Sequence, residues 1–204
     1  MHIRPLEPKY AGMVADLEVA LMPLKQREGF YRIKEMILVN KWLNTRMALG
    51  LFDDSRLVGY YLAYPLGFNR KVRSKHEKMI FISDFAVLPA YRHYVNNVLT
   101  SALLNSRIDF PCRPLITEAT EYYKNKWIRR EPFIRENGYA FAGCDPFRNP
   151  GFNEDLFRLR FEPVGAPVHA ARDRHALRVP PHVVFVLSKS YRFITKRIGK
   201  RANV

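Results

Sequence analysis

The order of apolar segments with strand-like and helix-like periods constrains the fold of this chain most. Strand-like runs are predicted at 2–6, 47–52, 57–64, 79–88, 115–119, 139–143 and 156–161. Helical spacing is predicted at 9–21, 30–43, 95–108 and 122–137, the last divided at Pro132, which interrupts a helix. A hairpin meander followed by alternating strands and helices predicts an α+β (mixed α/β) fold, with a central mixed sheet covered by helices on both faces.

The distribution of charge divides the 204-residue chain into a main domain, 1–162, and a basic extension, 163–204. The net charge is +15, and residues 165–204 contain nine Lys or Arg against the single acid Asp173. A linker at 163–167 is followed by a predicted basic amphipathic helix that begins at Pro180. Its charge predicts non-specific binding to a polyanion. Its apolar face would pack on the main domain or on a second subunit in a homo-oligomer.

Several classes of protein are disfavoured by what the sequence lacks. No run of about 18 apolar residues predicts a transmembrane helix, and the polar segment 1–8 does not resemble a secretory signal. The two cysteines, Cys112 and Cys144, and the six scattered histidines match no disulfide framework or metal-ligand spacing. We therefore expect a protein without a metal site in the reduced cytoplasm.

Three segments carry a resemblance to a known family. The segment 82–92 contains Val87-Leu88-Pro89-Ala90-Tyr91-Arg92, 101–104 reads Ser-Ala-Leu-Leu, and 133–139 reads Phe-Ile-Arg-Glu-Asn-Gly-Tyr. In this order they resemble the GNAT superfamily of N-acetyltransferases: the exit of its fourth strand, the helix that follows, and its F-Y-E-K-x-G-F ending. The predicted element order matches the family over about residues 2–162.

The resemblance implies an acyl-CoA-dependent N-acetyltransferase, with acetyl-CoA as co-substrate and an amine-bearing small molecule or protein as acceptor. The fourth strand would diverge from the fifth after about Ala86, so that the pantetheine arm binds between them like an added strand. A backbone amide near Val87 would polarise the thioester carbonyl, and helix N-terminal amides would hold the pyrophosphate. The cofactor-binding residues implied are Phe85, Ala86, Val87, Leu88, Arg92, His93, Val95, Asn96, Asn97, Val98 and Asn125.

Two positions depart from the family pattern. The family loop R-x-x-G-x-G/A is replaced by Arg92-His93-Tyr94-Val95-Asn96-Asn97-Val98, which contains no glycine. Asn is the best substitute for glycine at positive φ, whereas Val95 is poorly suited to it. The sequence therefore predicts an altered pyrophosphate site. The tyrosine of the F-Y-E-K ending, which can protonate the leaving thiolate in many members, is replaced by Ile134.

Five polar residues are candidates for the chemistry. Asp84 or Glu118, on the two neighbouring strands, could accept the proton of the amine directly or through a water; alternatively, both pair with nearby Lys and Arg. Tyr122 or Tyr123 could protonate the thiolate, or be ordinary half-buried aromatics. Asn125 could orient a ligand, or cap the start of a helix.

Two classes of function remain open from the sequence. The first is the N-acetyltransferase, with direct attack of the amine on the thioester. The second is a catalytically inactive GNAT-fold binding or structural protein, of a kind that the resemblance permits in viral and phage contexts. Its basic surface and tail would contact nucleic acid, an anionic surface or a protein partner.

Overall fold

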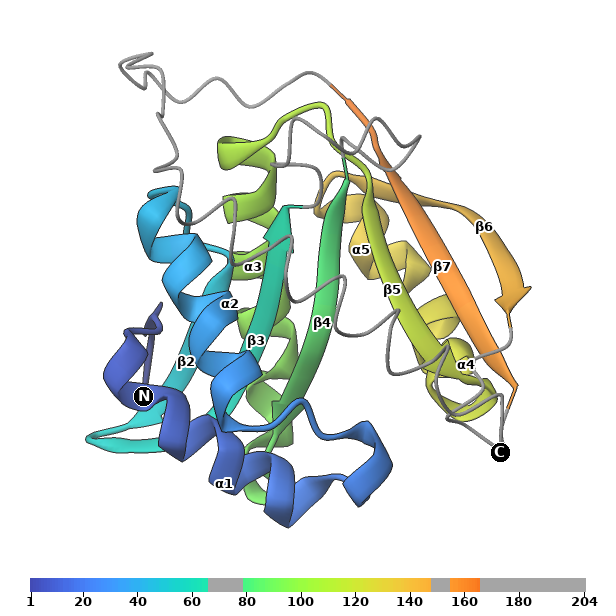
Figure 1. Ribbon diagram of the computed structural model, residues 1–204. Helices are drawn as coiled ribbons and strands as arrows, with labels where there is room; N and C mark the ends of the chain where they lie inside the picture. The colour runs from blue at the N-terminus through green and yellow to red at the C-terminus, as the bar shows by residue number, and fades with distance from the viewer. Residues whose placement is uncertain (66–78, 148–154, 166–204) are drawn as a thin grey trace, which may run out of the picture.

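A mixed β-sheet lies at the centre of the computed structural model, which describes residues 1–65, 79–147 and 155–165 (Figure 1). Within these residues the sheet has seven strands in the order β1-β2-β3-β4-β5-β7-β6. Only the β4–β5 pair is parallel. The strands are β1 (His2–Pro5), β2 (Ala48–Asp53), β3 (Arg56–Pro65), β4 (Ile80–Val87), β5 (Leu115–Thr120), β6 (Tyr139–Phe147) and β7 (Leu156–Pro163).

Helices cover both faces of this sheet. They are α1 (Ala11–Leu21), α2 (Phe30–Trp42), α3 (Val95–Asp109), α4 (Glu121–Arg129) and α5 (Glu131–Glu136), with short 3-10 helices η1 (Pro8–Tyr10), η2 (Leu24–Gln26) and η3 (Pro89–Tyr94). Helices α1 and α2 lie on one face, and α3 lies on the other (Figure 1). The predicted mixed sheet with helices on both faces is confirmed.

Two apolar cores hold these layers together because side chains alternate along the strands. On β3, Tyr60 and Leu62 face α1 and α2, where Ile33 and Ile37 pack against the sheet. Tyr61 of the same strand joins the opposite core, which is formed mainly by α3, α5 and the inner strands. Burial of this apolar surface on both faces is the main stabilising contribution to the fold.

Each strand and helix predicted within the described residues is present, and the largest differences concern ends and turns. The predicted helix 122–137 is divided into α4 and α5, with Pro132 in the first turn of α5. Strand β6 continues to Phe147, beyond the predicted end at 143. Nearly all of the basic extension, 166–204, lies outside the described residues, as does the segment 69–78, which the sequence predicts to be a loop and which contains five Lys or Arg residues.

A β-bulge in β4 separates this strand from β5. Leu62 of β3 is opposite Asp84, and the next residue, Ala63, is opposite Ile82, so Ser83 is an extra residue in the ladder. A bulge bends a strand and increases its twist. On the other side, β4 pairs with β5 only from Ile80 to Ile82, and the two ribbons diverge beyond that point (Figure 1). The predicted divergence is present, but it begins after Ile82 rather than after Ala86, because the bulge bends the strand there.

The last paired position of the two strands carries an additional contact. The Thr117 hydroxyl of β5 donates a hydrogen bond to the Ile82 carbonyl of β4 at 3.1 Å, and the Thr117 side chain is buried. Beyond this contact the backbone of β5 pairs with β7 alone. The junction between the two parts of the sheet is therefore short.

We predict that Gly59→Ala destabilises the chain by about 1–3 kcal/mol, a range typical of overpacking. A Cβ at Gly59 would lie 2.9 Å from Val87 Cγ2, 3.1 Å from the Ala86 carbonyl oxygen and 3.3 Å from Val87 Cα. The last two atoms belong to the backbone of β4 and cannot move without shifting the strand. Urea unfolding measures the effect. Gly143→Ala on β6 is the control, since its Cβ would meet nothing within 4 Å; equal stability of both variants would contradict the prediction.

Candidate functional site

The divergence of β4 from β5 turns a backbone amide toward the space between them. The Leu88 N–H donates to the Val58 carbonyl of β3 at 2.9 Å. Because neighbouring residues of an antiparallel strand point their polar groups in opposite directions, the Val87 N–H and C=O point toward β5. Strand β5 has already separated there. The Val87 N–H thus faces away from β3, and its role toward a thioester, which the resemblance implies, remains a prediction.

Basic and phenolic groups gather at the carboxyl ends of β4 and β5. Tyr122, in the first turn of α4, is 63% exposed, and Lys126 Nζ lies 4.0 Å from the centre of its ring. A hydrogen bond and the charge from Lys126, with a further contribution from the charge of Arg92, lower the pKa of the Tyr122 hydroxyl. Arg92 of η3 and Tyr122 of α4, far apart in the sequence, therefore interact at this end of the gap.

The turn after β4 is the 3-10 helix η3, and backbone amides in it donate to carbonyls of the same turn. The Tyr91 N–H donates to the Leu88 carbonyl at 2.9 Å, and the Val95 N–H donates to the Arg92 carbonyl. The Val98 side chain is fully buried in the core beneath α3. The Val95 N–H is therefore bonded within the turn, and the Val98 side chain is packed in the core. That the residues from Arg92 to Val98 surround a pyrophosphate remains a prediction.

The other residues of this turn remain accessible. His93, Asn96 and Asn97 are exposed, and the His93 ring lies 4.3 Å from that of Tyr94. The Tyr91 hydroxyl donates to Asp53 Oδ2 at 2.7 Å, which fixes the turn to the hairpin between β2 and β3. An anion at this end of the gap would meet Arg92, His93 and the two asparagine side chains.

Asp84 lies on the α1–α2 side of the gap in an unusual environment. Its Oδ1 accepts the Phe85 N–H at 2.7 Å, and its Oδ2 accepts a hydrogen bond from the Tyr60 hydroxyl. Burial raises the pKa of the Asp84 carboxyl to about 8, with contributions from the charges of Glu18 and Glu28, although the bond from Tyr60 opposes the shift. Asp84 can therefore exchange a proton near neutral pH.

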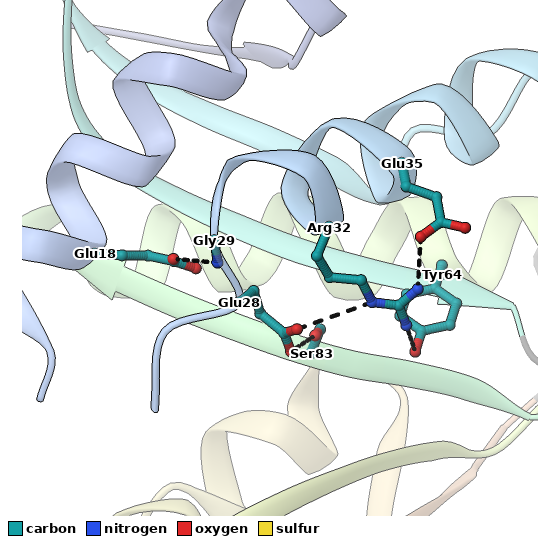
Figure 2. A network of polar contacts seen from close by, with 7 residues as sticks. All are labelled: Glu18, Glu28, Gly29, Arg32, Glu35, Tyr64 and Ser83. Carbon is teal, nitrogen blue, oxygen red and sulfur yellow. Dashed lines mark hydrogen bonds and ion pairs between the residues drawn. The ribbon is translucent and has the colours of Figure 1, made fainter. Parts of the chain in front are cut away.

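A polar network connects the α1–α2 segment to the bulge of β4. The Ser83 hydroxyl donates to Glu28 Oε1 at 2.7 Å, and the Gly29 N–H donates to Glu18 Oε2 at 3.1 Å. Figure 2 draws both contacts. Arg32 pairs with Glu35 at 3.0 Å and with Glu28 at 3.9 Å, and it donates to the Tyr64 hydroxyl at 2.9 Å. The segment before α2 is thus held against β4 beside Asp84.

The remaining candidates lie apart from Asp84 or have other partners. Glu118 is exposed and accepts a hydrogen bond from Arg158 of β7 at 2.6 Å. Tyr123 is 40% exposed, with its ring 5.1 Å from that of Tyr122. Asn125 lies within α4, not at its start, because the helix begins at Glu121; its amide donates to the Glu121 carboxyl at 3.2 Å.

Sequence reasoning missed Glu18, Glu28 and Tyr60. Glu18 carried a signal, since it follows Ala11 and Val14 on the inward stripe of α1, where a carboxyl group is unusual. The role of Tyr60 depends on the register of β3 against β4. The bulge at Ser83 sets that register locally, and the sequence does not reveal it.

The fold is shared with solved structures of very different sequence. The yncA protein of Salmonella typhimurium, solved with its cofactor acetyl-CoA, is 13% identical and has a TM-score of 0.59 over 85% of this chain and 98% of its own. Arabidopsis thaliana NAA60 in complex with acetyl-CoA is 15% identical, with a TM-score of 0.57 over 79% and 98%. The GNAT-like decarboxylase GphF in complex with isobutyryl-CoA is 13% identical, with a TM-score of 0.55 over 78% and 98%.

These similarities show that the chain has the GNAT fold. No protein-family model and no curated protein matches the sequence. Within the described residues, no helix is long and apolar enough to cross a membrane. In the same part of the chain, no group of three His, Cys, Asp or Glu side chains is placed to hold a metal ion.

We predict that Asp84→Asn stabilises the protein more strongly as the pH rises. The pKa of Asp84 is higher in the folded chain than its ordinary value, so the folded state binds the proton more tightly and the free energy of unfolding falls between about pH 4 and pH 8. The amide cannot ionise. The advantage of the variant over the original chain should grow by at least ~1 kcal/mol between about pH 5 and pH 8.5, measured by urea unfolding.

Asp16→Asn provides the control, since Asp16 is exposed on α1. Its stability difference from the original chain should not change between the two pH values. A flat difference for Asp84→Asn as well would show that the Asp84 carboxyl has no raised pKa.

Proposed function

We propose that this protein is an acyl-CoA-dependent N-acyltransferase that uses acetyl-CoA to acetylate an amine. The observation that carries the proposal is the separation of β4 from β5 after Ile82, with the Val87 amide directed into the gap. Two neighbours of the same fold, yncA and NAA60, were solved with acetyl-CoA. An extended pantetheine arm fits such a gap because its amides can pair with strand backbone.

The two ends of the gap differ in charge in a way that suits the two substrates. Lys126 lies against Tyr122 at the carboxyl ends of the strands, and the charge of Arg92 also acts on Tyr122. These two cations would bind the phosphates of CoA. Asp84 and Glu28 lie on the α1–α2 side and would attract a protonated amine. Because the glycine-rich loop is replaced by η3, we assign the phosphates to basic side chains more than to loop amides.

The reaction follows from these positions as a direct transfer. Asp84 accepts a proton from the ammonium group, and the neutral amine attacks the thioester carbon. The Val87 N–H stabilises the oxyanion that develops on the carbonyl oxygen. When the C–S bond breaks, Tyr122, whose pKa is lowered by Lys126 and Arg92, donates a proton to the thiolate. Tyr123 is the alternative donor.

The fold alone does not fix the reaction, since GphF is described as a decarboxylase. What favours amine transfer is the titratable Asp84 carboxyl beside the gap. Glu118 is a weaker candidate for the base because Arg158 pairs with it. The basic extension 163–204 remains a predicted polyanion-binding segment beside this activity.

We predict that acetyl-CoA binds to the full chain and that Arg92→Ala weakens binding by about tenfold or more, as expected for one lost charge-assisted phosphate contact. Isothermal titration calorimetry measures both. Arg4→Ala is the matched control, since Arg4 lies on the edge strand β1 and stacks on Phe52. No binding of acetyl-CoA at millimolar concentration would exclude the transferase and favour the inactive binding protein.

We predict that Asp84→Asn lowers the rate of acetyl transfer to amines by about 10²–10⁴-fold, the usual contribution of a general base. The dissociation constant for acetyl-CoA should stay unchanged, since Asp84 is placed on the acceptor side. Release of free CoA thiol from acetyl-CoA, with a panel of primary amines, measures the rate. An unchanged rate would assign the base to another group, and Glu118→Gln tests the first alternative.

A further inference from the structure

Glu18 is a buried acid in the middle of an otherwise apolar helix face. Glu18 is only 1% exposed, and its Oε2 accepts the Gly29 N–H at 3.1 Å. Its Oε1 is fully buried and has no hydrogen-bond partner. A buried carboxylate oxygen without a donor is costly, so this atom requires an explanation.

The group that Glu18 faces across the α1–β4 interface is the Asp84 carboxyl. Tyr60, which donates to Asp84, also contacts the Met22 sulfur at the end of α1, so Asp84 lies beside the helix that carries Glu18. Each carboxyl group acts on the pKa of the other, as expected for neighbours. Two ionised carboxylates cannot form a hydrogen bond, because neither has a proton to donate. One proton placed on either group supplies a donor to this buried pair, in which Glu18 Oε1 has no partner.

The other groups packed around the pair do not neutralise it. Tyr60 on β3 donates its hydroxyl to Asp84 but remains neutral, since burial and the Asp84 charge raise its pKa far above the ordinary value. Glu28, before α2, adds a further negative charge. Its cationic neighbour Arg32 pairs with Glu28 and Glu35 (Figure 2).

Arg27 lies in the same segment, but its guanidinium donates to the carbonyls of Met22 and Val19 at the end of α1. Neither arginine therefore supplies the hydrogen bond that Glu18 Oε1 lacks. A proton shared with Asp84 would stabilise two neighbouring buried carboxyl groups that no cation neutralises.

We propose that Glu18 is a positioning residue that shares one proton with Asp84, so that the pair carries a single negative charge and binds the acceptor amine as its ammonium ion. The inference deepens the proposed function and rests on it. It defines the acceptor as an amine that is protonated in solution, such as an alkylamine, and disfavours a neutral aromatic amine. Burial raises the pKa of Glu18 as well, in agreement with this arrangement.

The protons balance through the reaction. The ammonium gives one proton to the singly protonated pair, which becomes neutral, and the free amine forms the C–N bond. When the C–S bond breaks, the second proton of the attacking nitrogen reaches the thiolate through Tyr122 or solvent. The pair then releases its extra proton to water, so that the products are the amide, CoA thiol and one proton.

Glu18→Gln tests the shared proton directly. The glutamine carbonyl can accept the Gly29 N–H, and its amide can donate permanently to Asp84. We expect the pKa of Asp84 to fall by about one or more, because a neutral donor replaces a neighbouring negative charge. The measurement is a ¹³C NMR titration of the carboxyl carbons in the full chain without ligand, with urea unfolding to show that the variant is folded.

Glu35→Gln is the matched control, since it makes the same chemical change in the network of Figure 2 on the far side of Arg32. In Glu35→Gln, the pKa of Asp84 should be the same as in the original chain. The dissociation constant for acetyl-CoA should not change.

The outcomes separate this inference from the proposed function. An Asp84 titration that is the same in Glu18→Gln and in the original chain would overturn the shared proton, whatever the activity. If the pKa of Asp84 falls in Glu18→Gln but the original chain does not bind acetyl-CoA, the shared proton is supported and the proposed transferase activity is overturned.

Discussion

The bulge at Ser83 is the constraint on which the site depends. A regular β4 would continue its parallel ladder with β5, and every amide between them would be used in the sheet. The extra residue bends β4 after Ile82, and three consequences follow from this one irregularity. The Val87 amide points into the gap, Asp84 turns toward Tyr60 and α1, and Ser83 itself reaches Glu28. The positions of the candidate site residues are therefore set by the backbone irregularity in β4.

The chain places opposite charges around this gap despite its overall charge of +15. Carboxyl groups from α1, the α1–α2 segment and β4 lie together on one face of the sheet, whereas Arg92, Lys126 and Tyr122 lie at the strand ends. A negatively charged cofactor and a positively charged acceptor would thus be drawn to different sides of one opening. This separation supports a two-substrate reaction more strongly than any single residue does.

The sequence predicts the architecture well because hydrophobic periodicity and proline positions determine the helices and strands. It also places Asp84 and Val87 on the strand that diverges. It could not place Glu18 against Asp84, since their contact joins residues 66 positions apart through a local register shift. For Val95 and Asn125 the sequence pattern could not show the local partners: the Val95 N–H bonds to the Arg92 carbonyl at the end of η3, and the Asn125 side-chain amide donates to Glu121 within α4.

The short junction between β4 and β5 has a mechanical consequence. Within the described residues, the backbone ladder between β4 and β5 runs only from Ile80 to Ile82, with the Ile80 N–H to Pro114 carbonyl bond and the Thr117 hydroxyl at the same end. The rest of the junction is held by the apolar core that α3 and α5 share with both halves of the sheet. The continuity of the sheet across this junction therefore depends on side-chain packing more than on backbone pairing. The Tyr91 hydroxyl adds a separate tie between the turn after β4 and the β2–β3 hairpin.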